Sequence, residues 1–321
     1  MNTPKICQIG FDVGGTGLKA SLVQAGQILE TVTVNTPAQA KPEETIALMA
    51  RLILQLLNRA TELKLKVNAV GMGIAGLIDG PNGIVITSPN LPAWKNVPLS
   101  QKLQEHTGLP VKIDNDVRSM ALGEMAYGAG QNAENMLCLT VGTGVGSAII
   151  IKGEIYRGAS LTAGEFGHVM MVSEGGRNCG CGNRGCLETV AGTEAVLTLA
   201  QQYVQKGLAP ILAEKLATGQ ALTPQLVSEA AEAGDLGARA VWQEIGNWLG
   251  LALAGAVNFL NPEKIVIGGG ISAAGELLLT PIKQAIQLHA FASPAKTVEV
   301  LIATLGNHAG MIGAAVLAQE E

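Results

Sequence analysis

The order of apolar and polar positions predicts three strands at the start of the chain. Apolar residues dominate positions 5–13, as expected for a buried strand, and three of the next four residues are glycines. Further strand patterns follow at positions 18–24 and 28–34, with only short turns between them. Three strands in succession, joined in this way, predict a meander.

A long helix and further strands are expected next. Positions 42–63 have apolar residues at helical spacing and begin with Pro42, Glu43 and Glu44, which are typical of a helix start. Positions 67–74 predict another strand. Positions 110–113 predict a strand that leads into a helix near Val117.

The opening pattern recurs in the second half of the chain. Positions 139–151, with the turn Gly142-Thr143-Gly144, resemble positions 11–23 around their own glycine turn. This likeness indicates a diverged internal duplication, and the absence of any low-complexity linker predicts two domains joined by a tight hinge. The other elements predicted are helices at 193–206, 224–233 and 235–260, a strand at 264–267 and a terminal helix from Ala309.

Composition limits the classes of function. A chain of 321 residues with 48% hydrophobic and 15% charged residues predicts two well-packed domains. The net charge of -5 argues against nucleic acid as a main partner, and a small-molecule ligand is expected instead. The longest apolar run, 248–257, is shorter than the roughly 20 residues of a membrane span, and no signal peptide precedes the first strand. We therefore expect a cytoplasmic protein.

The glycine turns are candidates for binding phosphate. Asp12 ends the first strand, and the glycines after it leave backbone N–H groups open to phosphate oxygens, while its carboxylate could hold Mg²⁺ through water. An ordinary hairpin turn is the alternative, but the second copy at 142–146 favours a pair of turns that hold one triphosphate. The sequence has no Walker A motif, which excludes a P-loop kinase.

A third glycine cluster, Gly268-Gly269-Gly270, follows the strand at 264–267. With Ala273 it imitates a dinucleotide-binding fingerprint, which makes a nicotinamide-dependent dehydrogenase an alternative. No acidic residue closes a second strand about 20 positions on, as ribose recognition would require, so the match is weak. In a kinase the same glycines would let an adenosine lie flat against the backbone.

Three of the five cysteines, Cys179, Cys181 and Cys186, lie within eight positions. Together with His168 they make a set of four ligands for tetrahedral zinc, and four protein ligands leave no open position, so the metal is expected to be structural. A redox cluster is the alternative. Cys7 and Cys138 lie in apolar strand patterns and are expected to be packing residues.

Acidic and amide side chains form a candidate site for a polyhydroxyl compound. Asp116 lies between the strand at 110–113 and the next helix, where side chains commonly face a cleft, although it could simply cap the helix. Glu165 and Glu188 flank the cysteine cluster, and Asn90 lies in a Ser-Pro-Asn turn. Each of these residues alone could be an ordinary polar surface residue. Their placement next to glycine turns and a metal site favours a shared function.

With these motifs, the chain resembles the zinc-containing glucokinases of the ROK group (repressors, open reading frames, kinases) over almost its whole length. The segments that carry the resemblance are Asp12-Val13-Gly14-Gly15-Thr16, Ser88-Pro89-Asn90-Leu91-Pro92-Ala93-Trp94, Asn115-Asp116, Gly164-Glu165-Phe166-Gly167-His168 and residues 179–188. The last two segments together are highly specific.

The resemblance implies an α/β protein with duplicated actin-like, hexokinase-like (ribonuclease H-like) domains and a ligand cleft between them. The small domain would comprise residues 1–116 and about 306–321, and the large one 117–305, with a zinc loop at about 165–190. Phosphoryl transfer from ATP to the 6-hydroxyl of a hexose, with glucose expected, is the implied reaction.

The resemblance also implies roles for individual residues. Asp116 would be the catalytic base, and the sugar would contact Asn90, Asn115, Asp116, Glu165, His168 and Glu188. ATP and Mg²⁺ would contact Asp12, Gly14, Gly15, Thr16, Lys19, Thr143, Gly144, Gly269 and Gly270. Zinc would be held by His168, Cys179, Cys181 and Cys186, with the phosphate turns distant from it.

One departure from the family pattern follows Asp116. Relatives usually continue with small or amide residues, whereas Arg118 here places a cation near the expected site and leaves the choice of hexose open. Mannose, fructose, an N-acetylated hexosamine and polyphosphate as donor all remain alternatives, and a homodimer through the large domain is the family's usual state. Some members are repressors, but only about ten residues precede Asp12, too few for a DNA-reading helix.

Overall fold

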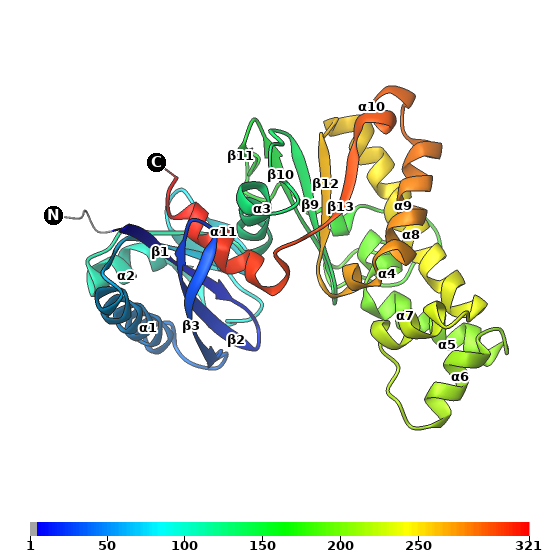
Figure 1. The fold of residues 1–321 in the computed structure, drawn as a ribbon, viewed down its shortest axis with the longest axis horizontal. Helices are drawn as coiled ribbons and strands as arrows, with labels where there is room; N and C mark the ends of the chain where they lie inside the picture. The colour runs from blue at the N-terminus through cyan, green and yellow to red at the C-terminus, as the bar shows by residue number, and fades with distance from the viewer. Residues whose placement is uncertain (1–4, 321) are drawn as a thin grey trace. The chain divides into compact units, whose positions relative to one another are not determined.

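The computed structural model describes residues 5–320 and divides them into two compact units (Figure 1). Of the described residues, the first unit contains 5–132, the short segment Ile155–Ala163 and 304–320. The second contains Ala133–Glu154 and Gly164–Ala303. The domain boundary expected at residue 116 therefore lies inside the first unit, where the next helix packs.

The first unit is built on a five-stranded sheet in the order β3-β2-β1-β4-β8. The strands β1, β2 and β3 pair antiparallel, as the predicted meander requires, whereas β1, β4 and β8 run parallel. The bounds are β1 Lys5–Val13, β2 Gly17–Gln24, β3 Gln27–Asn35, β4 Leu65–Ile74 and β8 Val111–Asn115.

Helix α1, Pro42–Glu62, covers one face of this sheet, and α2, Leu99–Thr107, lies beside it (Figure 1). The apolar stripe of α1 buries Ile46, Met49 and Ile53 in one core with Phe11 of β1. These side chains are at most 2% exposed, so this stripe, and not helix propensity alone, holds α1 in place.

Helices α3, Asp116–Tyr127, and α11, Ala309–Leu317, cover the opposite face. A side chain on Gly10 of β1 or Gly71 of β4 would collide with the α11 backbone at Met311 or Ala314, so these two glycines allow the helix to lie directly on the strands. Helix α3 packs in turn on α11 and β4, which is why residues 117–132 belong to the first unit.

A small antiparallel sheet was not predicted. It contains β5 Leu77–Asp79, β6 Ile84–Thr87 and β7 Lys95–Val97, in that order. The loop between β6 and β7 carries Asn90, and the buried side chains of Leu91 and Trp94 anchor that loop in the core. Its strands have three or four residues each, too few to show a clear alternation of apolar and polar positions.

The second unit repeats the topology of the first, with the strand order β11-β10-β9-β12-β13. Strands β9 and β10 form an antiparallel hairpin, and β9, β12 and β13 run parallel. The expected internal duplication is therefore present in the fold. The bounds are β9 Met136–Val141, β10 Val145–Ile151, β11 Glu154–Ile155, β12 Lys264–Gly268 and β13 Glu299–Ile302.

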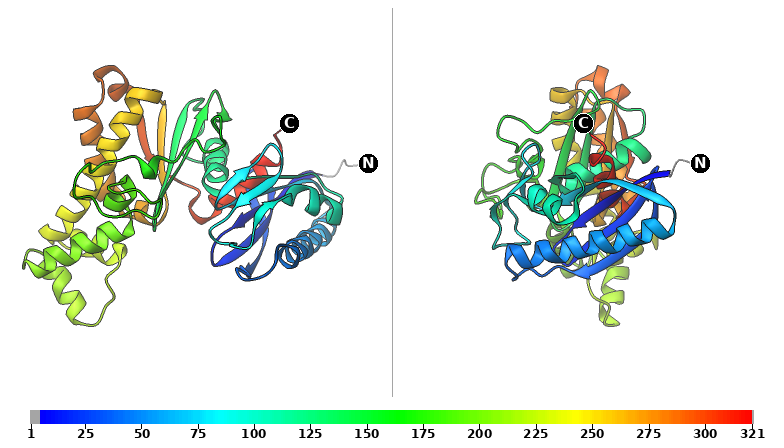
Figure 2. Two further views of the ribbon diagram at one scale, coloured as in Figure 1. Left: turned by 180° about the vertical axis from the view of Figure 1, so that it is seen from behind. Right: turned by 90° about the vertical axis from the view of Figure 1, so that its left-hand side faces the viewer.

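Most of the helices within residues 5–320 belong to this second unit. Helices α8 and α9 lie side by side along the sheet (Figure 2) and bury Trp242, Leu249 and Ile282. No helix within residues 5–320 is long and apolar enough to cross a membrane. The bounds are α4 Leu187–Ala191, α5 Thr193–Gln205, α6 Pro210–Ala217, α7 Pro224–Glu232, α8 Leu236–Leu260, α9 Glu276–His289 and α10 Ala292–Thr297.

Candidate active site and metal centre

Asp116 is the first residue of α3, directly after strand β8. The helix is capped by its neighbour Asn115, whose Oδ1 accepts hydrogen bonds from the N–H groups of Val117 at 2.9 Å and Arg118 at 3.3 Å. The Asn115 amide also donates to the carbonyl of Gly76 at 3.2 Å. Asn115, and not Asp116, is therefore the N-cap of α3, so the cap does not account for the Asp116 carboxylate.

The surroundings of Asp116 favour its protonated form. Burial raises the pKa of its carboxyl group, the negative charge of Asp12 raises it further, and a hydrogen bond from the Val117 N–H opposes both. A carboxylate with a raised pKa holds a proton more readily than a solvent-exposed one. This is the property required of a general base that works near neutral pH.

The first glycine turn closes through a hydrogen bond from Gly14 N–H to the Gly17 carbonyl at 3.1 Å. Gly15 and Thr16 at its tip are exposed. Lys19 pairs with Asp12 across the β1–β2 register, and its charge lowers the pKa of Asp12 while burial, the larger effect, raises it. A carboxylate and an ammonium beside exposed backbone N–H groups make a reasonable site for a metal–phosphate complex.

Asn90 lies against this same turn. A methyl group on Gly15 would come within 2.9 Å of the Asn90 Oδ1 atom, so the two residues are in close contact. The structure thus brings together, in the first unit, a residue predicted to hold sugar and one predicted to hold phosphate.

The second glycine turn, in the second unit, closes through Gly142 N–H and the Gly144 carbonyl at 2.9 Å. Helix α5 begins beside it, since the Thr193 N–H donates to the Gly142 carbonyl at 2.8 Å. The third glycine cluster also reaches this turn, with Gly270 N 3.9 Å from the position of a Gly142 methyl group. The predicted nucleotide residues of this unit therefore gather at one place.

Backbone conformation and packing both require glycine at position 269. Its φ of +86° lies in the left-handed region, and a Cβ atom there would come within 2.5 Å of the Val141 carbonyl oxygen. A Cβ atom on Gly270, by contrast, would meet no atom within 4 Å. Of these two predicted nucleotide contacts, only Gly270 has open space beside it.

The four predicted zinc ligands form one cluster. The His168 ring nitrogen and the three cysteine sulfurs all lie within 4.8 Å of one another. The sulfurs of Cys181 and Cys186 are 3.7 Å apart, and the Cys179 sulfur is 3.5 Å from His168 Nδ1. A tetrahedral zinc ion with Zn–S bonds of about 2.3 Å separates its sulfur ligands by about 3.8 Å. The residues therefore fit a structural zinc ion.

The electrostatics of the cluster also fit a cation. Burial and hydrogen bonds with the neighbouring thiols raise the pKa of Cys186 to about 12. Three thiols this close cannot all ionise without a compensating positive charge, and a divalent cation supplies it. The alternative of a redox site explains neither the histidine nor the spacing of the four ligand atoms.

The two ring nitrogens of His168 face different partners. Nδ1 faces the Cys179 sulfur, and Nε2 lies 3.8 Å from the Glu165 carboxylate. Both residues belong to the short 3₁₀ segment Phe166–His168 or its N-cap, and both side chains are partly exposed. Nε2 and Glu165 are thus available to a ligand on the solvent side of the metal cluster.

Glu188 connects the metal cluster to the second glycine turn. Its Oε1 accepts a hydrogen bond from the Cys179 thiol at 3.6 Å, and its Oε2 accepts one from the Val145 N–H at 3.1 Å. Helix α4 begins right after Cys186 and carries Glu188 in its first turn. The expectation that the phosphate turns are distant from the metal is therefore wrong for the second turn.

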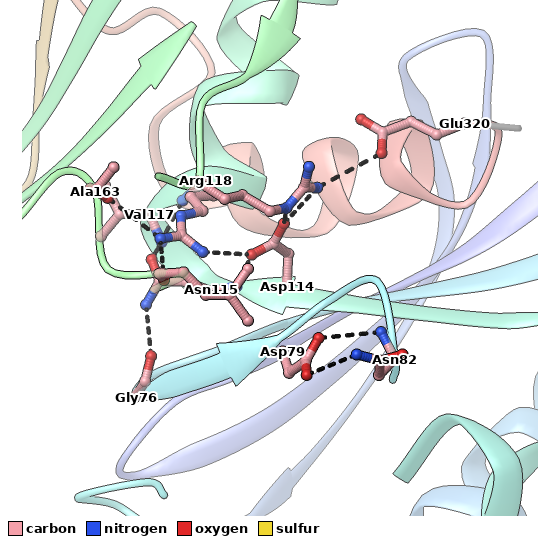
Figure 3. A network of polar contacts seen from close by, with 11 residues as sticks. Gly76, Asp79, Asn82, Asp114, Asn115, Val117, Arg118, Ala163 and Glu320 are labelled. Carbon is pink, nitrogen blue, oxygen red and sulfur yellow. Dashed lines mark hydrogen bonds and ion pairs between the residues drawn. The ribbon is translucent and has the colours of Figure 1, made fainter. Parts of the chain in front are cut away.

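Arg118 does not present a free cation to the site. It is buried, and its guanidinium pairs with Asp114, which lies on strand β8 four residues earlier, at 3.1 Å (Figure 3). Arg157 pairs with the other oxygen of the same carboxylate at 2.7 Å. This network was not predicted from the sequence. The only signal was an acidic residue and a basic residue four positions apart, and the partner Arg157 is 43 residues from Asp114.

Comparison with known proteins identifies relatives along the whole chain. The model of the ROK family matches residues 8–321. A glucokinase from Halalkalibacterium halodurans is 41% identical over 98% of this chain and 95% of its own length. A xylose repressor from Caldicellulosiruptor bescii is 31% identical over 95% of this chain and 76% of its own length.

A solved structure matches equally well. The ROK family glucokinase from Streptomyces griseus, crystallised with glucose and AMPPNP, is 36% identical and superposes with a TM-score of 0.79. The match covers 98% of this chain and all of that one. Together with the metal cluster and the duplicated sheets, these matches show that the chain belongs to the ROK family.

Proposed function

We propose that this chain is an ATP-dependent glucokinase, which transfers the γ-phosphoryl group of ATP to the 6-hydroxyl of glucose. The observation that carries the proposal is the match to a glucokinase solved with glucose and an ATP analogue, which covers 98% of the chain. The relative from Halalkalibacterium halodurans supports the same activity at 41% identity. Because ATP is the donor, we place the reaction in the cytoplasm.

Asp116 is the proposed base. Its carboxylate would take the proton of the 6-hydroxyl as the oxygen attacks the γ-phosphorus, and the raised pKa makes it a better acceptor for that proton. The transition state of phosphoryl transfer is loose, so the main task of the protein is to align the two substrates and neutralise charge. Asn90, Glu165, His168 and Glu188 would hold the remaining hydroxyl groups. Asn115 stays a predicted sugar contact, although its side chain already caps α3.

The two glycine turns are the proposed phosphate sites. Gly14, Gly15 and Thr16 offer one set of backbone N–H groups, and Thr143 and Gly144 offer the other. Lys19 would add a positive charge on the first turn, and Asp12 is placed to hold Mg²⁺, which neutralises phosphate charge when it is bound. Gly269 and Gly270 would lie beside the adenosine.

The zinc site is proposed to be structural. His168, Cys179, Cys181 and Cys186 would fill all four positions of a tetrahedral ion, so zinc would serve only to fold the loop that carries Glu165 and Glu188. The chemistry would then belong entirely to Asp116 and the phosphate sites.

A coupled assay tests the proposed activity. Purified protein, ATP and Mg²⁺ would be tested with glucose, mannose, fructose and N-acetylated hexosamines, and polyphosphate would replace ATP in a parallel series. We expect the highest kcat/KM with glucose and ATP. A higher value for another sugar or donor would reassign the substrate, and no turnover with any sugar would reject the kinase.

A homodimer is the proposed assembly. Within residues 5–320, the ends of α8 and α9 leave a group of apolar side chains exposed, with Phe259 89%, Leu288 76% and Phe291 72% accessible. The Asn258 side chain accepts a hydrogen bond from the Phe291 N–H, so these ends lie together. An exposed apolar group of this kind on the second unit supports pairing with a second copy.

A further inference from the structure

The Asp114 carboxylate lies at the centre of a buried charge network in the first unit (Figure 3). Its side chain is fully buried, and Oδ1 accepts hydrogen bonds from Arg118 at 3.1 Å and from the Asn115 N–H at 2.8 Å. Oδ2 accepts a bond from Arg157 Nε at 2.8 Å. Arg157 also lies 3.8 Å from Glu320. Both arginine charges are therefore compensated by carboxylates.

Arg118 also binds the chain segment that contains Arg157. Its second terminal nitrogen donates to the carbonyl of Leu161 at 2.7 Å and to that of Ala163 at 3.2 Å. The guanidinium thus connects the first turn of α3 to residues 155–163, with carbonyl partners 43 and 45 positions beyond Arg118 along the chain. The planar guanidinium has enough donors to reach the carboxylate and both carbonyls together.

The segment depends on this support. Leu161 has a φ of +63°, a left-handed conformation that is uncommon for a leucine and needs external contacts to hold it. The carbonyl of this residue receives the shorter of the two bonds from Arg118. Ala163, which receives the other, stands two residues before Glu165.

We propose that Arg118 is a positioning residue for sugar binding. It fixes residues 155–163 against the helix that begins with Asp116, and so sets the point from which the chain continues to Glu165 and His168. The proposal rests on the proposed kinase function. The charge of Arg118 is compensated by Asp114 and its donors are occupied by two carbonyls, so the residue acts as a support and does not bind substrate itself.

Two substitutions at Arg118 test the proposal. Arg118→Lys keeps a positive charge beside Asp114 but cannot also reach both carbonyls, and Arg118→Met removes charge and donors. We expect the glucose KM to rise about 10-fold to 100-fold in both variants, while the ATP KM stays within about twofold of wild type. Arg59→Met, which removes an arginine from the exposed surface of α1, is the matched control and should leave both constants unchanged.

Hydrogen exchange separates positioning from general loss of stability. In Arg118→Lys, amides of residues 158–165 should exchange faster, while those of β1 and β4 keep wild-type rates. A wild-type glucose KM in Arg118→Lys would overturn the proposal, and so would faster exchange spread evenly over the first unit. Failure of the wild-type protein to phosphorylate glucose would instead reject the proposed function, and this outcome is visible before any variant is made.

Discussion

At the scale of single residues, the catalytic role proposed for Asp116 conflicts with stability. Its pKa is raised in the folded protein above the ordinary value of 3.8. The folded state therefore binds more protons than the unfolded state between these two values, and stability falls as pH rises through that window. The cost is carried by the ionised form, because burial and the nearby charge of Asp12 both disfavour a negative charge on this carboxyl group.

Asp116→Asn should therefore lose activity and gain stability. The amide cannot accept the hydroxyl proton, and removal of a general base typically costs about 10² to 10⁴ in rate. The same change removes the unfavourable buried charge, so the Tm at pH 7 should rise. Steady-state kinetics and calorimetry check the two effects, and glucose binding by titration should survive. A variant that keeps more than about a tenth of the wild-type kcat would show that the base is elsewhere.

The pH profile should reveal the coupling between Asp116 and Asp12. The negative charge of Asp12 raises the pKa of Asp116, so Asp12→Asn should lower it. The acid limb of kcat/KM would then move to lower pH, although the absolute rate falls because a proposed Mg²⁺ ligand is lost. The experiment measures the midpoint of that limb in both proteins. An unchanged midpoint would mean that another group controls the acid limb.

At the scale of elements, the metal loop and helix α4 form one support for two sites. Cys186 ends the loop, α4 starts with Leu187, and Glu188 in its first turn accepts a hydrogen bond from the Val145 N–H. Loss of the proposed metal is therefore expected to affect both the proposed sugar residues and the second glycine turn.

Cys181→Ser should lower the zinc content and weaken glucose binding together. Loss of a ligand commonly costs about 10-fold to 100-fold in metal affinity. Because Glu188 contacts both Cys179 and the second turn, nucleotide affinity should fall as well, in contrast to the behaviour expected if these sites were distant. Metal analysis after dialysis and two binding titrations test this. Cys7→Ser changes a cysteine in the sheet of the other unit, so this control variant should keep its zinc. A zinc-free Cys181→Ser variant with wild-type glucose affinity would show that the metal stabilises only its own loop.

At the scale of the whole molecule, long patterns of apolar and polar positions predicted helices and strands correctly, and short patterns did not. Strand β1 and helix α1 follow the prediction to within a residue, because long apolar runs and stripes persist whatever they pack against. The spacing of the cysteines also predicted a cluster with His168, and the four side chains do lie together, although zinc at this cluster stays a prediction. The strands of the β5–β7 sheet are too short to show an alternation of apolar and polar positions. The Asp114–Arg157 pair joins positions 43 residues apart, and a single sequence does not record such a contact.

The proposed dimer provides a test at the same scale. Replacing Leu288 by Glu should place a charge in the apolar group at the ends of α8 and α9 and shift the protein towards monomer. Leu54→Glu, on the exposed side of α1 in the first unit, is the matched control and should leave the assembly unchanged. Sedimentation velocity over a range of concentrations measures both. Identical sedimentation of Leu288→Glu and wild type would direct the search to another surface.

The place of α11 has a consequence for synthesis of the chain. The helix lies directly on β1 and β4, against Gly10 and Gly71, yet the ribosome makes it after every strand and helix of the second unit. During translation the first sheet therefore lacks α11 on the face that this helix shares with α3, while the second unit already has all of its own strands. The unit whose synthesis begins first is therefore completed last. Until then, the surface of β1 and β4 that α11 later covers is open to a chaperone.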